Sequence, residues 1–206
     1  MSVTGTSQVT GNATAGTTVT KGASAVIGGT ITNNALAPVM TMPSVPQCSP
    51  FSSNSGISGT YTYNAGTGDL SLSGINIATL ANGTYCFHNV SLSNSGQLKV
   101  NGPVVVRLTG TLTVGGASSV NNTTQIPNNL RILSSYSGTN GVALGNSSSL
   151  QLVIYAPQTS VNITGSAPLF GTVVGKTVTV SNSGMIHYDT KLKTIWPAVW
   201  TLIFGP

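Results

Sequence analysis

The sequence has no glutamate and few charges of either sign. Seven Lys and Arg residues and two aspartates, Asp69 and Asp189, are the only ionised side chains among 206 residues at neutral pH. The net charge of +5 comes from bases that are scattered along the chain. Scattered bases do not build the cationic patch of a nucleic-acid-binding protein, so we expect no nucleic-acid partner.

Long apolar segments are also missing. The longest apolar stretch, Ile195–Phe204, is interrupted by Pro197 and is far shorter than the roughly 20 residues that cross a bilayer. We therefore expect no membrane insertion. The first residues, Met1–Gly5, lack the basic and apolar regions of a signal peptide, so an export leader is expected to be cleaved or to lie outside this numbering.

Small and polar residues fill much of the chain instead. Gly, Ser, Thr and Asn together make up nearly half of the sequence. Such a composition would suggest disorder, but 39% of the residues are hydrophobic and the mean hydropathy is +0.24. Helix-forming residues are scarce while Thr, Val and Ile are frequent, so the sequence predicts an all-β fold.

Short repeats run from Ser2 to Asn34. An apolar residue recurs about every five to seven positions, at Val3, Val9, Val19, Val26 and Ile31, with Ala13 or Ala15 filling the gap between Val9 and Val19. This period is too short for hairpins and too long for simple strand alternation. It suits a β-solenoid, in which each coil has about three short strands and stacks on the next coil.

The pattern returns after Val90. Apolar strands such as Val104–Leu108 and Leu150–Tyr155 alternate with Asn- and Gly-rich segments such as Asn101–Gly102, which tolerate the left-handed backbone that coil corners require. The sequence predicts one β-solenoid domain over residues 1–194 and an apolar C-terminal tail over residues 195–206.

Residues 37–89 interrupt this pattern. Prolines at positions 38, 43, 46 and 50 cannot donate to a β-ladder, so we expect Ala37–Pro50 to leave the sheet as an extended surface segment. Thr60–Tyr63 and Leu70–Leu72 flank a Gly-rich turn and predict a hairpin beside the solenoid.

The two cysteines, Cys48 and Cys86, lie far apart in the sequence without CxxC spacing. In a chain with an extracellular composition this favours a disulfide, which would pin the proline-rich segment to the solenoid wall. Two buried thiols are one alternative, and a metal site that includes His88 is another. A fourth ligand is hard to find, so no metal and no cofactor are expected.

Six motifs of the sequence are distinctive: Gly83–His88, Val100–Val104, Leu133–Tyr136, Val153–Pro157, Gly171–Lys176 and Ile186–Asp189. Together they resemble a β-helical domain found in bacterial pilus-assembly and other surface proteins, related in architecture to bactofilins. The resemblance runs from about Ser2 to Asp189, and it implies a right-handed parallel β-helix with a surface or filament role and no established catalytic residues. The chain lacks the hydrophobic N-terminal helix of prepilins, so assembly through an ordinary type IV pilus core is not implied.

Enzymatic activity has little support in the sequence. Many β-helices cleave polysaccharides with paired carboxylates, but Asp69 lies in a Gly-rich turn and Asp189 lies near two lysines. His187 has no GxSxG partner motif, and no nucleotide-binding loop occurs. The chain is therefore expected not to be an enzyme.

Thr-x-Thr pairs offer another hypothesis. Stacked on one flat face, they would order water and bind ice, but their irregular spacing argues against a threonine ladder. The pairs are Thr18/Thr20, Thr30/Thr32, Thr60/Thr62, Thr111/Thr113 and Thr177/Thr179.

The apolar tail carries the main functional expectation. The end coils of a β-solenoid expose unpaired backbone and apolar core, and a tail rich in Trp is costly in water. We expect a non-enzymatic subunit that polymerises into an extracellular fibre through end-to-end and tail contacts. The alternatives are a monomeric surface adhesin, with a glycan or pilus partner, whose tail caps its own chain, and an ice-binding protein. The tail residues expected to dock on a neighbouring subunit are Ile195, Trp196, Val199, Trp200, Leu202, Ile203 and Phe204.

Overall fold

The computed structural model is all-β, with 54% of residues in strands and 2% in helices. It describes residues 2–3, 8–9, 11–14, 18–34, 42–145, 149–165 and 168–192. The contacts group the chain into two compact units, Met1–Thr41 and Met42–Pro206, and each unit is described by itself. The all-β expectation is confirmed, while the single domain over residues 1–194 stays a prediction.

Unit 1 consists of two short stacked coils. Each strand of the first coil pairs in parallel with the equivalent strand of the second, as in the register of Ala13 with Ile31. Val3, Ala13, Val19 and Ala25 are buried between the coils. The first coil holds β1 (Ser2–Val3), β2 (Gln8–Val9) and β3 (Ala13–Thr14), and the second holds β4 (Thr20–Lys21), β5 (Val26–Ile27) and β6 (Ile31–Thr32).

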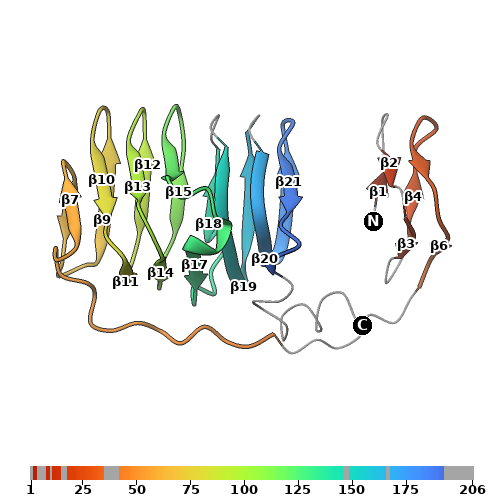
Figure 1. Ribbon diagram of the computed structural model, residues 1–206. Coiled ribbons are helices and arrows are strands. Elements are labelled where there is room, and N and C mark those ends of the chain that lie inside the picture. The colour runs from red at the N-terminus through yellow and green to blue at the C-terminus, as the bar shows by residue number, and fades with distance from the viewer. Residues whose placement is uncertain are drawn as a thin grey trace. The chain divides into compact units, whose positions relative to one another are not determined.

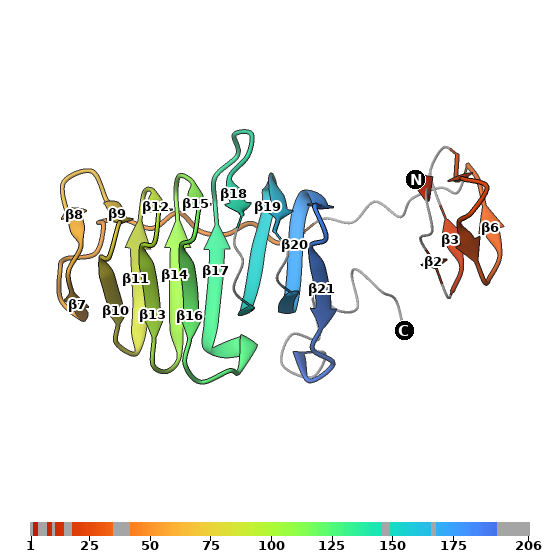
Figure 2. The same ribbon diagram turned by 90° about the horizontal axis from the view of Figure 1, so that it is seen from above.

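Unit 2 stacks parallel strands in three rows (Figures 1 and 2). The rows give a β-solenoid, with about eight turns counted over the whole chain, which confirms the predicted fold class. The first row contains β10 (Ile77–Leu80), β13 (Gln97–Val100) and β16 (Ser119–Asn122); the second contains β11 (Gly83–Phe87), β14 (Val104–Leu108) and β17 (Leu130–Ser134); the third contains β9 (Asp69–Ser73), β12 (Val90–Ser93), β15 (Leu112–Val114) and β18 (Val142–Leu144).

The last coils are built from longer strands. β19 (Leu150–Thr164) and β20 (Pro168–Ser181) pair in parallel along most of their length, with one irregularity in register between Ala156 and Ser160. β19 pairs with β17 and also with β18, so it passes through two rows. β21 (Met185–Tyr188) pairs with the start of β20 and ends the described stack.

Aliphatic columns form the core because strands in register place equivalent side chains one above another, about 4.8 Å apart. One column in the third row runs through Leu70, Val90, Leu112, Val142 and Val161, and all five side chains are buried. Alternate residues point outward, which explains why Ser and Thr separate the aliphatic residues.

The first coil of unit 2 is covered by antiparallel strands. β8 (Thr62–Asn64) pairs with β9, and β7 (Ile57–Gly59) pairs with β10, both antiparallel. The ring of Tyr63 packs edge-on against Phe87, with centroids 5.5 Å apart. The predicted side hairpin is therefore confirmed, and it covers the core at this end of unit 2.

The proline-rich segment crosses the outside of the second row, and we call Met42–Phe51 the strap. In Figures 1 and 2 it runs alongside the stacked strands from the β20 end towards β7. Met42, Val45 and Cys48 are half-buried and the residues between them are exposed, so a partly buried side chain recurs every three residues. Three residues per turn is the period of a polyproline II helix, so the expected extended excursion is confirmed over its described part.

The dimensions of the strap match those of the solenoid. Three residues of polyproline II helix advance about 9.3 Å, and two strand spacings amount to about 9.6 Å. Residues spaced by three along such a helix would reach equivalent positions two coils apart, in agreement with the partial burial of Met42, Val45 and Cys48. This match explains how an irregular segment packs against a regular wall.

Candidate functional site

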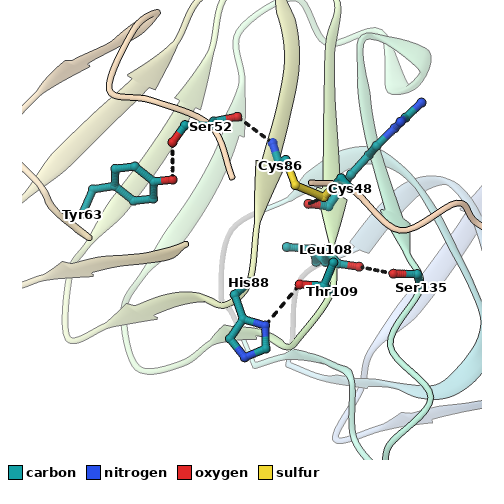
Figure 3. Close-up of a disulfide and its surroundings, with 9 residues drawn as sticks. Cys48, Ser52, Tyr63, Cys86, His88, Leu108, Thr109 and Ser135 are labelled. Atoms are coloured by element: carbon teal, nitrogen blue, oxygen red, sulfur yellow. Dashed lines mark hydrogen bonds between the residues drawn. A yellow bond between two sulfur atoms is a disulfide. The ribbon is translucent and has the colours of Figure 1, made fainter. Parts of the chain in front are cut away.

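A disulfide joins the strap to the wall of unit 2. Cys48 and Cys86 of β11 are bonded, with their Cα atoms 5.7 Å apart, which confirms the prediction of a disulfide (Figure 3). Both sulfur atoms are used in this bond, so neither cysteine is a thiolate ligand for a metal. Among the described residues, no group of three or more His, Cys, Asp or Glu side chains gathers to hold a metal ion.

Hydrogen bonds hold the strap on both sides of the disulfide. The Ser52 amide donates to the Cys86 carbonyl oxygen at 2.9 Å, and the Cys86 amide donates to Ser52 Oγ at 2.7 Å. Tyr63 donates its hydroxyl to the Ser52 carbonyl oxygen, as Figure 3 shows. Further along the strap, the Tyr155 hydroxyl donates to the carbonyl oxygen of Pro43 at 2.5 Å. The strap is thereby fastened to β11 and to β19.

The last coil in the described part of unit 2, formed by β20 and β21, carries exposed side chains at core positions. Val178 continues the column of Val142 and Val161, yet it is 41% exposed whereas both predecessors are fully buried. Ile186 continues the column of Leu150 and Leu169 and is 38% exposed. We call the core-facing side of β20 and β21 the open end.

The neighbouring column of side chains, which ends at Val180, also changes from buried to exposed in β20. Val180 follows Leu144 and Ile163, which are buried, and is itself 41% exposed. Within β21, Met185 is also exposed, and the strand contains no Lys, Arg, Asp, Glu or Pro. Charges and prolines are the residues with which proteins protect an edge strand from pairing, so this edge lacks that protection.

The predicted docking tail cannot be placed against the open end, because it lies outside the described residues. Its residues are Ile195, Trp196, Val199, Trp200, Leu202, Ile203 and Phe204.

The two carboxylates lie in coils far apart. Asp69 is in β9 of the first coil, and Asp189 follows β21 in the last coil. Five strand spacings along the third row separate β9 from β20, or about 24 Å. Paired carboxylates in glycosidases lie within about 10 Å of each other, so these two cannot flank one glycosidic bond.

Asp69 instead takes part in local hydrogen bonds. A bond from the Thr67 side chain is the main cause that lowers its pKa, with desolvation opposing it and the Asn89 side chain and backbone lowering it further. Asn89 Nδ2 donates to Asp69 Oδ1 at 2.8 Å, and Asn89 Oδ1 accepts from the Thr111 amide at 2.9 Å. These contacts link three successive coils and give Asp69 a structural role.

Both histidines have identified neighbours, and His88 also lies close enough to Asp69 to help lower the pKa of that carboxyl group. His88 Nδ1 lies 3.1 Å from Thr109 Oγ1 (Figure 3). The His187 ring stacks on Phe170, with centroids 4.8 Å apart and ring planes at 15°. Neither arrangement positions a serine or cysteine nucleophile.

Threonines do not form an unbroken ladder on the third row. Thr62, Thr113 and Thr179 occupy one outward column, but Ala143 and Asn162 separate Thr113 from Thr179. The outward face therefore mixes hydroxyl, amide and methyl groups. It does not present the unbroken row of threonines that regular ordering of water would require.

A groove on the outward side of β19, β20 and β21 is not anticipated by the sequence reasoning. It encloses about 420 Å³ and is lined by Gln125, Pro127, Gln151, Phe170, His187, Tyr188 and Asp189. The signal that could have revealed it is an unusually long coil between β14 and β17.

Among the described residues, no helix is both long and apolar enough to cross a lipid bilayer. Comparison with curated proteins and with solved structures gives no match. Residues 53–195, more than half of the chain, match a domain of unknown function (DUF7305). This match carries no affiliation with pilus-assembly proteins or bactofilins, so that part of the resemblance stays an expectation. The chain belongs to the DUF7305 family.

Proposed function

We propose that this protein is a non-enzymatic structural subunit that self-associates into an extracellular fibre through the open end of its solenoid. The observation that carries the proposal is the exposure of Val178, Val180 and Ile186 at positions where the preceding coils have buried side chains. A second copy that stacked on β20 and β21 would continue both the core columns and the backbone ladder.

The energetics favour an occupant for this surface. Covering each of these three half-exposed side chains contributes about 1 kcal/mol, and backbone pairing along β21 adds to that. The other end of unit 2 carries antiparallel strands, so the two ends differ. Contacts between unlike surfaces propagate into open filaments unless a rotation closes them into a ring.

The tail adds a second source of contacts in this proposal. The segment from Ile195 to Phe204 follows the open end in the chain and contains two tryptophans. Docked on a neighbouring subunit, it would fill a groove or add a strand. Docked on its own chain, it would cover the open end and leave a monomer.

An extracellular location fits the disulfide, because such bonds persist in oxidising compartments. The resemblance to domains of pilus-assembly and other surface proteins supports the same location and a filament role. A monomeric surface adhesin is the second candidate function, favoured by the groove on the outward face of β19–β21.

Introducing a charge at the open end tests self-association. In Ile186→Lys an ammonium group would have to be buried at the stacking surface, so we expect long assemblies to be lost while the monomer keeps its thermal unfolding midpoint. Ile75→Lys is the matched control, because Ile75 is 92% exposed in the turn between β9 and β10. Negative-stain microscopy and light scattering over a concentration series provide the measurement.

The outcomes separate the two candidate functions. A wild-type protein that stays monomeric at every concentration, or assemblies that survive Ile186→Lys, would contradict the proposal. Deletion of residues 195–206 then identifies the role of the tail. A fibre subunit becomes monomeric or insoluble, whereas an adhesin whose tail caps its own chain loses only stability.

A further inference from the structure

The groove on β19–β21 is built by an insertion in one coil. In the second row, the coil from Val106 to Ile132 is several positions longer than the coil before it, Tyr85 to Val106, and the coil after it, Ile132 to Ile154. The additional residues form the loop Thr123–Asn129, which includes the 3-10 turn η1 (Pro127–Asn129). In solenoid proteins, loops inserted into single repeats often carry the binding site.

A buried amide holds this loop in one conformation. Asn122 is 1% exposed, and its Nδ2 donates to the Ile126 carbonyl oxygen at 2.8 Å and to the Gln151 carbonyl oxygen at 3.0 Å. Its Oδ1 accepts from the Thr124 amide and hydroxyl at 3.2 and 2.7 Å. All four hydrogen-bonding positions of the amide are used. The loop wall is thus organised before any ligand arrives.

The strand that packs against the loop, β20, has a glycine at the point of closest approach. Gly171 has a φ of +141°, and a Cβ atom there would collide with the Leu152 carbonyl oxygen and lie 3.2 Å from Pro127 Cβ. Only glycine lets β20 approach both β19 and the loop this closely. Pro127 is buried against this position, so the loop packs directly on the strands that form the groove.

The groove combines an aromatic surface with donors and acceptors. Gln151, Phe170 and His187 occupy successive positions of one outward column, and Phe170 is 38% exposed. Gln125 faces them from the loop, and Asp189 completes the lining at the end of β21. The two glutamine amides both donate and accept, while the carboxylate of Asp189 accepts.

We propose that this groove binds a neutral saccharide. A pyranose presents several hydroxyl groups, which match the amides and the carboxylate, and an apolar C–H face, which matches the exposed part of the Phe170–His187 stack. None of the described lining residues is Lys or Arg, and Asp189 repels anions, so phosphate and sulfate groups fit poorly. The volume of about 420 Å³ lies within the usual range of small-ligand sites and accommodates one or two sugar rings.

This site is separate from the assembly surface. The groove is centred on the outward column of Gln151, Phe170 and His187, whereas the open end consists of core-facing positions of β20 and β21. All residues that line the groove belong to one copy of the chain. Saccharide binding therefore does not depend on self-association, and each proposal can fail without the other.

Saturation-transfer NMR on the full-length protein tests the site. The probes are neutral tetrasaccharides of glucose, galactose and N-acetylglucosamine, each titrated separately. We expect at least one probe to show saturable transfer to ring protons, together with shifts of the His187 imidazole resonances. Phe170→Ala should weaken binding at least tenfold and Asp189→Asn several-fold, with unchanged circular dichroism. Ile75→Ala is the matched control, since it truncates an exposed apolar side chain elsewhere and should bind like the wild type.

Three results would overturn the proposal. The first is the absence of saturable transfer from every probe. The second is equal binding by the wild type and a folded Phe170→Ala variant. The third is displacement of the saccharide by millimolar inorganic phosphate, which would identify an anion site instead. If Phe170→Ala does not fold, Gln151→Ala takes its place, with a several-fold loss of affinity expected.

Discussion

The hydroxyl of Tyr155 donates a hydrogen bond to the carbonyl oxygen of Pro43, 112 positions earlier in the chain. This bond fastens the strap to β19, while the disulfide at Cys48 fastens it to β11. Between these two points the strap passes β14 and β17, so it spans three strand spacings of the second row. The strap thus ties successive coils together along the axis on which they stack.

Tyr155→Phe should loosen this end of the strap. Loss of one hydrogen bond is expected to lower the free energy of unfolding by about 1 kcal/mol, because the ring remains packed and only the hydroxyl is removed. Urea denaturation measures the change, and hydrogen exchange at Val45 reports local opening. Tyr61→Phe is the control, since the Tyr61 hydroxyl makes a longer bond of 3.3 Å within the first coil. An equal opening of the strap in both variants would contradict this role.

Removal of the disulfide should have a larger effect. The double variant Cys48→Ser/Cys86→Ser releases a loop whose ends are 38 positions apart, which corresponds to about 3–4 kcal/mol of stability from chain entropy. Reduction of the wild type should give the same destabilisation, measured by denaturant unfolding with and without a reducing agent. Identical unfolding curves in the two conditions would show that the hydrogen bonds of the strap suffice to hold it.

Gly171→Ala should destabilise the solenoid by more than about 1 kcal/mol, because Gly171 combines a positive φ with a close approach to the Leu152 carbonyl oxygen. Gly115→Ala is the matched control. A Cβ at Gly115 would meet no atom within 4 Å, and this glycine is not among those with positive φ. Thermal unfolding of both variants measures the difference, and similar midpoints would argue against strain at Gly171.

Asn122→Asp should disrupt the loop that forms the groove wall. The substitution replaces the donor Nδ2 with an oxygen that faces the carbonyl oxygens of Ile126 and Gln151, so we expect a loss of about 1–3 kcal/mol. The neighbouring variant Asn121→Asp adds the same charge at an exposed position and should have little effect. Denaturant unfolding compares the two variants, and equal losses would indicate a general effect of charge.

Asp69 should make stability depend on pH below about 5. Its pKa is lowered in the folded state, so its contribution is fully present above the unfolded pKa of about 3.9 and is lost as the pH falls through the folded pKa. Asp69→Asn should flatten this part of the stability profile, although the effect is small because the carboxyl group is largely solvated. Asn89→Ala should move the pKa of Asp69 upward in an NMR titration. An unchanged titration would exclude Asn89 as a cause of the shift.

Local sequence patterns were sufficient to predict the solenoid. The spacing of Val3, Val9 and Val19 reflects short strands that each place one or two side chains inward before a corner, which depends on neighbours in the chain. Val26 departs from this pattern, because Ile27 is the residue in register with Val9, and Val26 is 48% exposed. The prolines at 43, 46 and 50 predicted a segment outside the sheet, because each proline lacks the backbone N–H that a β-ladder requires. This signal is also local to the sequence. The two cysteines in a chain of extracellular composition favoured a disulfide over two buried thiols or a metal site, and the structure contains that disulfide.

Contacts between distant segments could not be predicted in this way. Nothing near Pro43 in the sequence indicates that its carbonyl oxygen meets Tyr155, and nothing near Phe170 indicates that His187 stacks on it. These contacts depend on the number of residues in each coil, because one additional residue moves every later side chain to another position on the wall. The groove likewise required the inserted loop and the glycine below it to come together.

The sequence by itself therefore determined the all-β class, the coil repeat and the covalent cross-link, since each depends on local periodicity or on residue identity. Only the tertiary structure decided which coil ends the described stack, which of its core positions are exposed, and which polar side chains share one groove. Those features are set by the register between strands, and the register is a property of the stacked coils as a whole.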